Sequence, residues 1–203
     1  TWKLATFFEN QWGRGLARLG YGIGGESTVV NKDNAAGSGR NPSVLLRKVF
    51  DVATPSIYTG LHLFLQRDDG LAVYLNGTRI FSDNLASGAT LSDFASSEIG
   101  TGEHLNWHHY FVDRKYLIPG RNLVAVELHQ SSISGTDLTF DMQLTGSLTG
   151  DPPPLFMKAA AGGFELSWPA AYSGWQPWAS PDAGQTPWTP VAETMLSDAG
   201  WIY

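Results

Sequence analysis

An alternation of apolar and polar residues is the strongest constraint on how this chain folds. Between residues 137 and 148 the apolar positions are 138, 140, 142 and 144, with polar residues between them. Similar strand-forming segments occur at 44–50, 61–67, 71–75, 78–81, 107–113 and 122–129. Period two is the side-chain repeat of a β-strand with one buried face, and no window shows the ~3.6-residue repeat of an amphipathic helix. The sequence therefore predicts an all-β protein.

Turn signals separate these segments. Asp68-Asp69-Gly70 stands between 61–67 and 71–75, and Asn76-Gly77 follows 71–75 directly. Asn-Gly is a strong hairpin signal because both central positions of a type I′ turn need a positive φ. Many short strands joined by turns predict an antiparallel β-sandwich over residues 1–150. Two long loops, roughly 82–106 and 31–42, are where we expect binding residues.

The composition of the chain changes after a run of prolines. Residues 151–154, Asp-Pro-Pro-Pro, predict a stiff linker, and five of the eight tryptophans follow it. Residues 155–203 are too few for an independent sandwich, so we expect a small Trp-rich β-module, or a tail that docks on another β-surface. A hairpin is expected there, with strands at 155–158 and 164–168.

Composition excludes several classes of protein. A net charge of −6 argues against binding to the nucleic-acid backbone, and 42% hydrophobic residues exclude intrinsic disorder. No stretch approaches the ~18 apolar residues of a membrane span. The chain has no cysteine, which excludes disulfides and thiolate chemistry. It also lacks the common hydrolase and nucleotide-binding motifs, so we expect no catalysis; His104, His108 and His109 are the only material for an enzyme.

Acidic side chains suggest a calcium site. Asp68 and Asp69 precede a turn, and Glu127, Asp137 and Asp141 lie on two predicted strands. If those two strands are neighbours, their carboxylates meet on one face of the sheet. Calcium takes about six to eight oxygen ligands, which these residues and nearby carbonyls would supply. The alternative is that they are turn formers and ordinary polar residues on a half-solvated sheet.

Aromatic residues after the long loop suggest a carbohydrate site. Trp107 and His109 point to the same side of their predicted strand, and sugars pack a C–H face on aromatic rings while their hydroxyls form hydrogen bonds. We add Tyr74, Asn76 and Arg67 to this predicted carbohydrate-binding set. The alternative for Trp107 is a place in the core.

Several segments together carry a family resemblance: 17–22, 26–30, 46–50, 67–77 (RDDGLAVYLNG), 122–130 (NLVAVELHQ) and 137–142 (DLTFDM). As a set they resemble the galactose-binding-like jelly-roll domains of large secreted bacterial proteins, of the type frequent in Planctomycetes and Verrucomicrobia. The resemblance covers roughly residues 2–148. It implies a jelly-roll β-sandwich that is usually non-catalytic, often calcium-stabilised, secreted or at the cell surface, and binds a polysaccharide or other glycan or links domains. The Asp68-Asp69-Gly70 run is also similar to protective-antigen-type lectin domains, where paired aspartates hold calcium.

Two departures from that pattern suggest an alternative function. The chain starts at Thr1 with no signal peptide, and family members normally have a further strand before Trp2, so we expect that the beginning was removed. The segment after the prolines is similar to short β-modules that close such proteins. A missing strand at one end and surplus strands at the other fit strand donation or tail docking between copies of the chain. The alternative function is therefore a structural subunit of an extracellular fibre.

Overall fold

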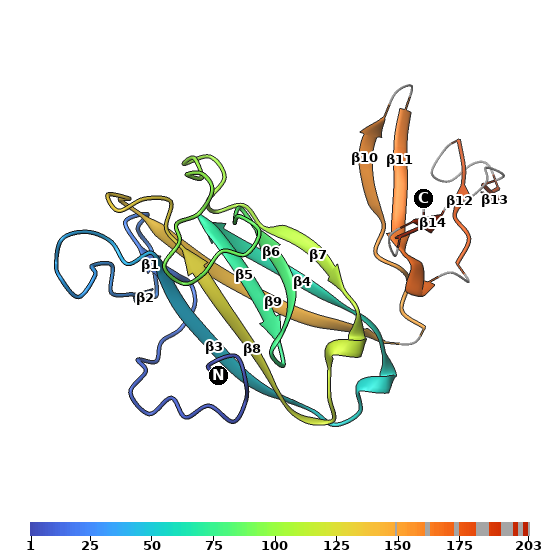
Figure 1. The fold of residues 1–203 in the computed structure, drawn as a ribbon. Helices are drawn as coiled ribbons and strands as arrows, with labels where there is room; N and C mark the ends of the chain where they lie inside the picture. The colour runs from blue at the N-terminus through green and yellow to red at the C-terminus, as the bar shows by residue number, and fades with distance from the viewer. Residues whose placement is uncertain are drawn as a thin grey trace. The chain divides into compact units, whose positions relative to one another are not determined.

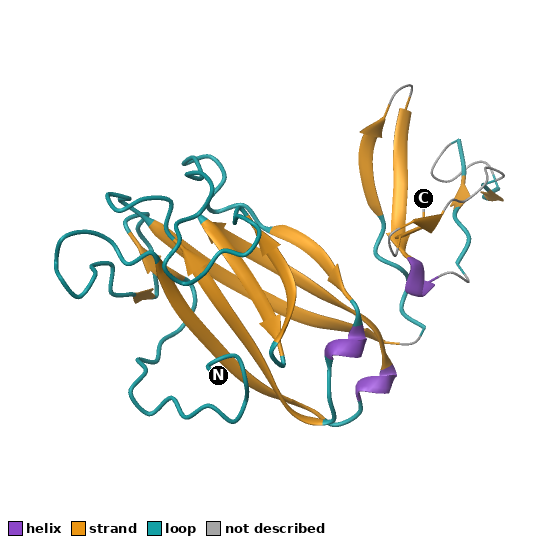
Figure 2. Ribbon diagram, viewed as in Figure 1, coloured by secondary structure: helices purple, strands orange, loops and turns teal. Residues whose placement is uncertain are grey.

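The computed structural model describes residues 1–148, 150–160, 163–172, 175–181, 187–191, 197–198 and 201–202. They form two compact units, Thr1–Gly146 and Ser147–Tyr203 (Figure 1). The described residues contain strands and three short 3-10 turns but no α-helix (Figure 2): η1 (Pro55–Ile57), η2 (Arg114–Tyr116) and η3 (Ala170–Tyr172). Within these ranges no helix has the length and apolar character needed to cross a bilayer.

The first unit is a sandwich of two sheets. The β9 sheet has the order β2 (Thr28–Val29), β1 (Leu19–Tyr21), β9 (Leu138–Leu148), β4 (Tyr58–Asp68) and β7 (His108–Val112). The β8 sheet has the order β3 (Ser43–Val52), β8 (Gly120–His129), β5 (Gly70–Leu75) and β6 (Thr78–Asp83). The predicted all-β antiparallel jelly-roll sandwich, followed by a small C-terminal β-module, is confirmed; the short β1–β2 pair is parallel.

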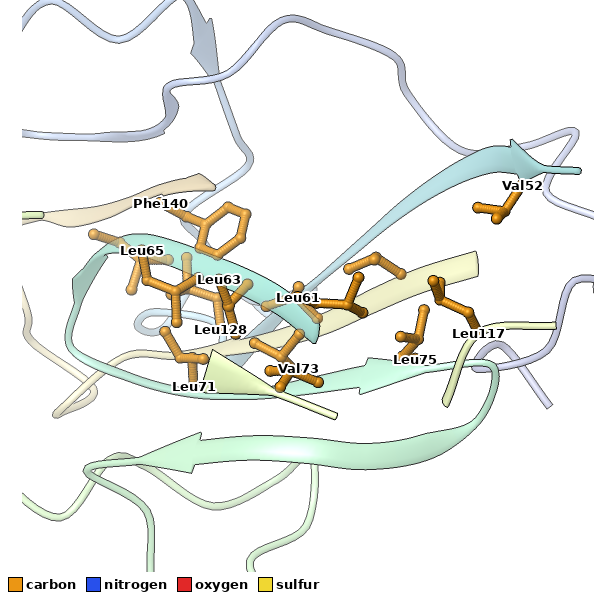
Figure 3. Close-up of a cluster of buried hydrophobic side chains, with 14 of the residues drawn as sticks. Val52, Leu61, Leu63, Leu65, Leu71, Val73, Leu75, Leu117, Leu128 and Phe140 are labelled. Atoms are coloured by element: carbon orange, nitrogen blue, oxygen red, sulfur yellow. The ribbon is translucent and has the colours of Figure 1, made fainter. Parts of the chain in front are cut away.

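One hydrophobic core fills the space between the sheets (Figure 3). Both sheets contribute alternate residues to it, among them Leu61, Leu63 and Leu65 from β4, Leu71, Val73 and Leu75 from β5, and Leu128 from β8. The alternation predicted for 137–148 is confirmed, because Leu138 and Phe140 are buried in this core and Met142 and Leu144 pack against it. The opposite residues of each strand are left for the outer faces, which carry the candidate sites.

The two turn signals have different effects on the chain. Asn76 and Gly77 have φ values of 52° and 87°, as the type I′ prediction requires, and they join β5 to β6. Asp68-Asp69-Gly70 instead carries the chain from β4 in one sheet to β5 in the other. Asp68 and Asp69 therefore lie at one end of the sandwich, beside the long loops.

The N-terminal segment covers the outer face of the β8 sheet. Trp2 and Ala5 pack against a second apolar cluster made of Ala72, Tyr74, Leu123 and Ala125. Arg47 on β3 forms an ion pair with Glu9 and donates a hydrogen bond to the Leu4 carbonyl, with 2.8 Å between the atoms. Residues of the N-terminal segment thus cover part of the outer face of the β8 sheet.

The second unit contains the expected hairpin. β10 (Phe156–Ala160) pairs antiparallel with β11 (Gly163–Pro169), so the hairpin prediction is confirmed. β11 also pairs with β15 (Trp201–Ile202), which in turn pairs with β14 (Ser197–Asp198). Separately, β12 (Trp178–Ala179) pairs with β13 (Thr189–Pro190). Trp168 is buried within this part of the chain. The linker at 151–154 and the docking of 155–203 stay predictions.

Candidate functional site

Four rings on neighbouring strands form a stripe on the outer face of the β9 sheet. β4 contributes His62 and Phe64, and β7 contributes His109 and Phe111; we call these residues the aromatic stripe. The strands are paired so that His62 lies opposite Phe111 and Phe64 opposite His109. Their side chains point outward because Leu61, Leu63 and Leu65, which alternate with them, fill the core. All four are partly exposed.

The rings of the stripe are stacked. The centroids of Phe64 and His109 are 4.4 Å apart at an interplanar angle of 15°, and those of His62 and His109 are 5.0 Å apart at 13°. Nδ1 of His62 and Nε2 of His109 lie 2.9 Å apart, so one of the two donates a hydrogen bond to the other. Burial lowers the pKa of both imidazoles, and for His109 the charge of His62 lowers it further. The stripe therefore presents neutral rings at neutral pH.

Trp107 is next to the stripe in the chain. β7 begins at His108, one residue later than the predicted strand, so Trp107 is the last residue of the loop, two residues before His109, and 50% of its surface is exposed. The alternative that places Trp107 in the core is therefore wrong. Asp141 and Gln143 on β9 alternate with core residues and add polar groups to this outer face. Aromatic surface flanked by hydrogen-bonding groups is the chemistry that sugars need.

Tyr74 belongs to the second apolar cluster, on the outer face of the β8 sheet. Its hydroxyl donates to Glu127 Oε1 across 2.6 Å, its ring lies 3.6 Å from Lys3 Nζ, and it is only 7% exposed. Burial and the neighbouring Glu127 carboxylate raise the pKa of this hydroxyl. Tyr74 therefore lies in the sheet opposite the one that contains His109.

Arg67 and Asn76 likewise make contacts within the sandwich. Arg67 is buried, donates through Nε to Asp83 across 2.7 Å and approaches Glu103 at 3.5 Å. The Asn76 side chain forms hydrogen bonds with Tyr116, Asn122 and Leu123. Of the predicted carbohydrate set, His109 is the member that lies in the stripe, and Trp107 precedes it by two residues in the chain. The sequence analysis did not predict His62, Phe64 or Phe111. The alternation of His62 and Phe64 with leucines in 61–65, and the aromatic character of all three residues, were visible in the sequence.

A second cluster lies at the end of β4. The donor atoms of Asp68, His104 and Asp137 all lie within 4.8 Å of one another. His104 Nδ1 is 3.9 Å from Asp68 Oδ2 and 3.9 Å from Asp137 Oδ2. Asp68 is 1% exposed and His104 is 8% exposed. The long loop before β7 folds back to bring His104 to this place, a contact that no sequence spacing indicates.

Asp68 and the adjacent Asp69 differ in their surroundings. Burial, a hydrogen bond with the Asp69 carboxyl, and the charges of Asp69, Asp137 and Glu98 raise the pKa of Asp68 to about 9. The two carboxylate oxygens of Asp69 instead accept backbone N–H groups, from Ile99 across 2.8 Å and from Ser131 across 2.6 Å. Asp69 therefore holds two loops in place, while Asp68 faces the cluster.

The remaining predicted calcium ligands lie elsewhere. β8 pairs with β3 and β5, and β9 pairs with β1 and stands beside β4, so the premise that the strands of Glu127 and Asp141 are neighbours is wrong. Glu127 lies in the β8 sheet, 3.7 Å from Lys3 Nζ and bonded to Tyr74. Asp141 accepts the backbone N–H of Met142 on the outer face of the β9 sheet. Of the predicted set, Asp68 and Asp137 meet in one place beside His104, and calcium binding stays a prediction.

Comparisons with known proteins give distant likenesses. No protein-family model and no curated protein sequence matches the chain. Among solved structures, Streptomyces avermitilis α-L-rhamnosidase has a TM-score of 0.38 at 15% identity, over 62% of this chain and 9% of that one. A rhamnosidase from Dictyoglumus thermophilum (0.37, 16%, 61% and 12%) and a β-glycosidase from Bacteroides vulgatus (0.36, 12%, 82% and 25%) are similar at the same level. Likeness at this level assigns no activity, and the chain spans at most 25% of these three proteins.

Proposed function

We propose that residues 1–148 form a secreted, extracellular, non-catalytic module that binds a polysaccharide or other glycan on the outer face of the β9 sheet. The observation that carries this proposal is the aromatic stripe of His62, Phe64, His109 and Phe111, with the half-exposed Trp107 next to it in the chain. The outer face of a sheet is broad and rigid, as binding to a chain of sugar rings requires.

The chemistry of the stripe favours an uncharged ligand. The aliphatic face of a pyranose ring packs on aromatic rings, a contact in which the apolar surface of both partners leaves water. The two imidazoles are neutral at neutral pH, because burial lowers their pKa. Beyond the hydrogen bond that joins them, one ring keeps an acceptor nitrogen and the other an N–H donor for sugar hydroxyls. Asp141 and Gln143 supply further polar groups at the β9 side of the stripe.

Retention on polysaccharides tests the proposal. In affinity electrophoresis through gels containing xylan, mannan, mixed-linkage glucan or pectin, the wild-type chain should be retarded by at least one polymer, and Trp107→Ala should lose at least ~10-fold in affinity, the effect of about 1.4 kcal/mol. Phe8→Ala is the matched control, since Phe8 is an exposed aromatic residue (79%) of the N-terminal segment. Circular dichroism should show both variants folded. Equal retention of Trp107→Ala and wild type, or no retention on any polymer, would contradict the proposal.

A specific observation also favours the alternative function, a structural subunit that assembles through residues 155–203. In the β10–β11 hairpin Met157 lies opposite Leu166 and Ala159 opposite Phe164. Met157, Phe164 and Leu166 are exposed, whereas Lys158 and Glu165 form an ion pair (2.7 Å) from the alternate positions. An apolar hairpin face of this kind is suited to pack against another β-surface, in a neighbouring copy for the fibre hypothesis.

Light scattering and electron microscopy distinguish this alternative. The full chain should form oligomers or filaments at high concentration, and the double substitution Phe164→Ser with Leu166→Ser should abolish them. A Lys158→Ser chain, changed on the other face of the same hairpin, should still assemble. A wild-type chain that stays monomeric at high concentration, or a double variant that still assembles, excludes this hairpin face as the basis of a fibre.

A further inference from the structure

Two buried polar side chains, Asp68 and His104, meet the partly exposed Asp137, and each of the two has a polar atom without a hydrogen-bond partner. Oδ2 of Asp68 and Nδ1 of His104 are buried and have no hydrogen-bond partner, although each lies 3.9 Å from a neighbouring group of the cluster. A buried polar atom without a partner is costly, because it has lost its water and gained nothing in exchange. Both atoms point into the space that they share with Asp137 Oδ2.

We infer that Asp68, His104 and Asp137 form a binding site for a divalent transition-metal ion of the zinc class. An ion between the three side chains would satisfy both unpartnered atoms at once. It would also bring positive charge to a place where the side chains of Asp68 and Asp137 meet beside a third acidic residue, Asp69. The inference does not depend on glycan binding, since none of these residues belongs to the aromatic stripe.

The distances fit one small ion. Zinc binds imidazole nitrogen and carboxylate oxygen at about 2.0–2.2 Å in tetrahedral geometry, so two ligand atoms of the same ion are roughly 3.4 Å apart. The two separations that involve His104 are both 3.9 Å, so a small movement of these side chains brings them to that spacing. The two carboxylates lie within 4.8 Å of each other and need at most a small side-chain rotation to reach the same ion. Three protein ligands leave a further position for water.

The ligand types select the ion. Calcium and magnesium take oxygen ligands almost exclusively, whereas imidazole nitrogen suits zinc, iron, nickel and copper. One imidazole with two carboxylates therefore favours zinc over the calcium that the sequence alone suggests. His104 is the residue that makes this difference, and it comes from the loop between β6 and β7, outside either sheet.

The site would join three separate segments of the chain. Asp68 ends β4, Asp137 directly precedes β9, and His104 belongs to the long loop. Asp69 already ties Ile99 of the same loop and Ser131 to the end of β4. A metal that binds only this folded arrangement stabilises it by mass action.

Zinc titration of the chelator-treated, dialysed full chain tests the inference. Isothermal titration with zinc chloride should give one ion per chain. Zinc at ~100 times its Kd should raise the melting temperature by roughly 5–10 °C. His104→Gln and Asp68→Asn should each weaken zinc binding by at least ~100-fold, more than loss of an outer-shell partner costs. His108→Gln is the matched control, because His108 follows the same loop but pairs with Glu103 at 3.7 Å.

Two further measurements complete the test. Cobalt, used in place of zinc, should give visible absorption bands in the wild type that disappear in His104→Gln. Calcium chloride, titrated in parallel, should bind far more weakly. A wild type that takes up no zinc overturns the inference without any variant, and so does equal zinc binding by wild type and His104→Gln. Tight calcium binding without zinc binding would overturn the choice of ion.

Discussion

At the scale of single residues, Asn76 holds three parts of the sandwich together. Its amide donates to the Tyr116 carbonyl across 2.9 Å and to Asn122 Oδ1 across 2.8 Å. Its oxygen accepts the backbone N–H of Leu123 across 2.9 Å, and its φ is 52°. These bonds join the β5–β6 turn to η2 and β8. Asn76 therefore acts in the fold, although the sequence analysis placed it in the predicted carbohydrate-binding set.

We predict that Asn76→Ala lowers the free energy of unfolding by about 3 kcal/mol, since it removes several hydrogen bonds worth ~1 kcal/mol each and puts alanine at a positive φ that asparagine tolerates better. Asn76→Gly loses the same bonds but tolerates the backbone conformation, so it should cost about 1 kcal/mol less. Urea denaturation of both variants measures the difference. If alanine and glycine cost the same, positive φ contributes nothing at this position.

The two histidines of the aromatic stripe give a pH dependence. Burial lowers the folded-state pKa of His62 and His109 below 6.5, so between 6.5 and the lowered value the unfolded chain binds more protons than the folded one. The contribution to stability is therefore complete above pH 6.5 and is lost as the pH falls through this window. We predict a melting temperature that decreases on acidification, and a smaller decrease for His109→Gln. An unchanged slope in that variant would contradict the assignment.

Sequence reasoning found some site residues and not others for a physical reason. His109 was found because strand alternation fixes the side of a sheet on which each residue lies. His104 was associated only with a possible enzyme, since its meeting with Asp68 and Asp137 depends on how an irregular loop of some twenty residues folds back. Loop conformation leaves no period in the sequence, so no pattern places His104 beside those carboxylates.

At the scale of elements, Arg47 connects β3 to the N-terminal segment. Its guanidinium pairs with Glu9, donates to the Leu4 carbonyl, and lies 5.2 Å from the Phe7 ring centroid and 5.9 Å from that of Trp12. A guanidinium makes such planar, multiple contacts where a lysine does not. We therefore treat Arg47 as the main attachment of residues 1–12 to the sandwich.

We predict that Arg47→Ala releases this segment and leaves the sandwich folded. Limited trypsin digestion should cleave after Lys3 or Arg14 at least several-fold faster in the variant, because proteolysis requires local detachment of the backbone. Arg114→Ala, changed at η2, is the control and should leave these cleavage rates unchanged. Equal cleavage rates in Arg47→Ala and wild type would show that the apolar contacts of Trp2 and Ala5 hold the segment by themselves.

Strand alternation determines how much of the fold the sequence predicts. Alternation located the long strands. β4 and β8 extend the predicted bounds by a few residues, whereas β7 (108–112) is shorter than the predicted 107–113 and leaves Trp107 outside the strand. β1 and β2 were missed because 3 and 2 residues are too short to show a period. The partners of β8 and β9 were also missed, since alternation fixes which face of a strand is buried but does not fix which strands are neighbours.

At the scale of the whole molecule, the two candidate sites share one loop. His104 of the metal cluster and Trp107 of the glycan face are separated by two residues, and the Leu105 carbonyl between them accepts a hydrogen bond from Gln66 across 2.6 Å. Gln66 lies on β4, between the aromatic stripe and Asp68. An ion that fixes His104 would therefore also restrict the position of Trp107.

We predict that the two ligands are coupled through this loop. A metal that orders the loop reduces the entropy that Trp107 loses when the glycan binds. The polysaccharide that retards the wild-type chain should therefore bind a few-fold more weakly to chelator-treated protein than to the zinc form. Coupling of binding free energies is reciprocal, so the polysaccharide should tighten zinc binding by the same factor. Phe64→Ala, on β4 outside the loop, should weaken glycan binding in both forms while zinc titration stays unchanged. Glycan affinity that is identical with and without zinc, in a chain shown to bind both, would mean that His104 and Trp107 act independently despite their closeness.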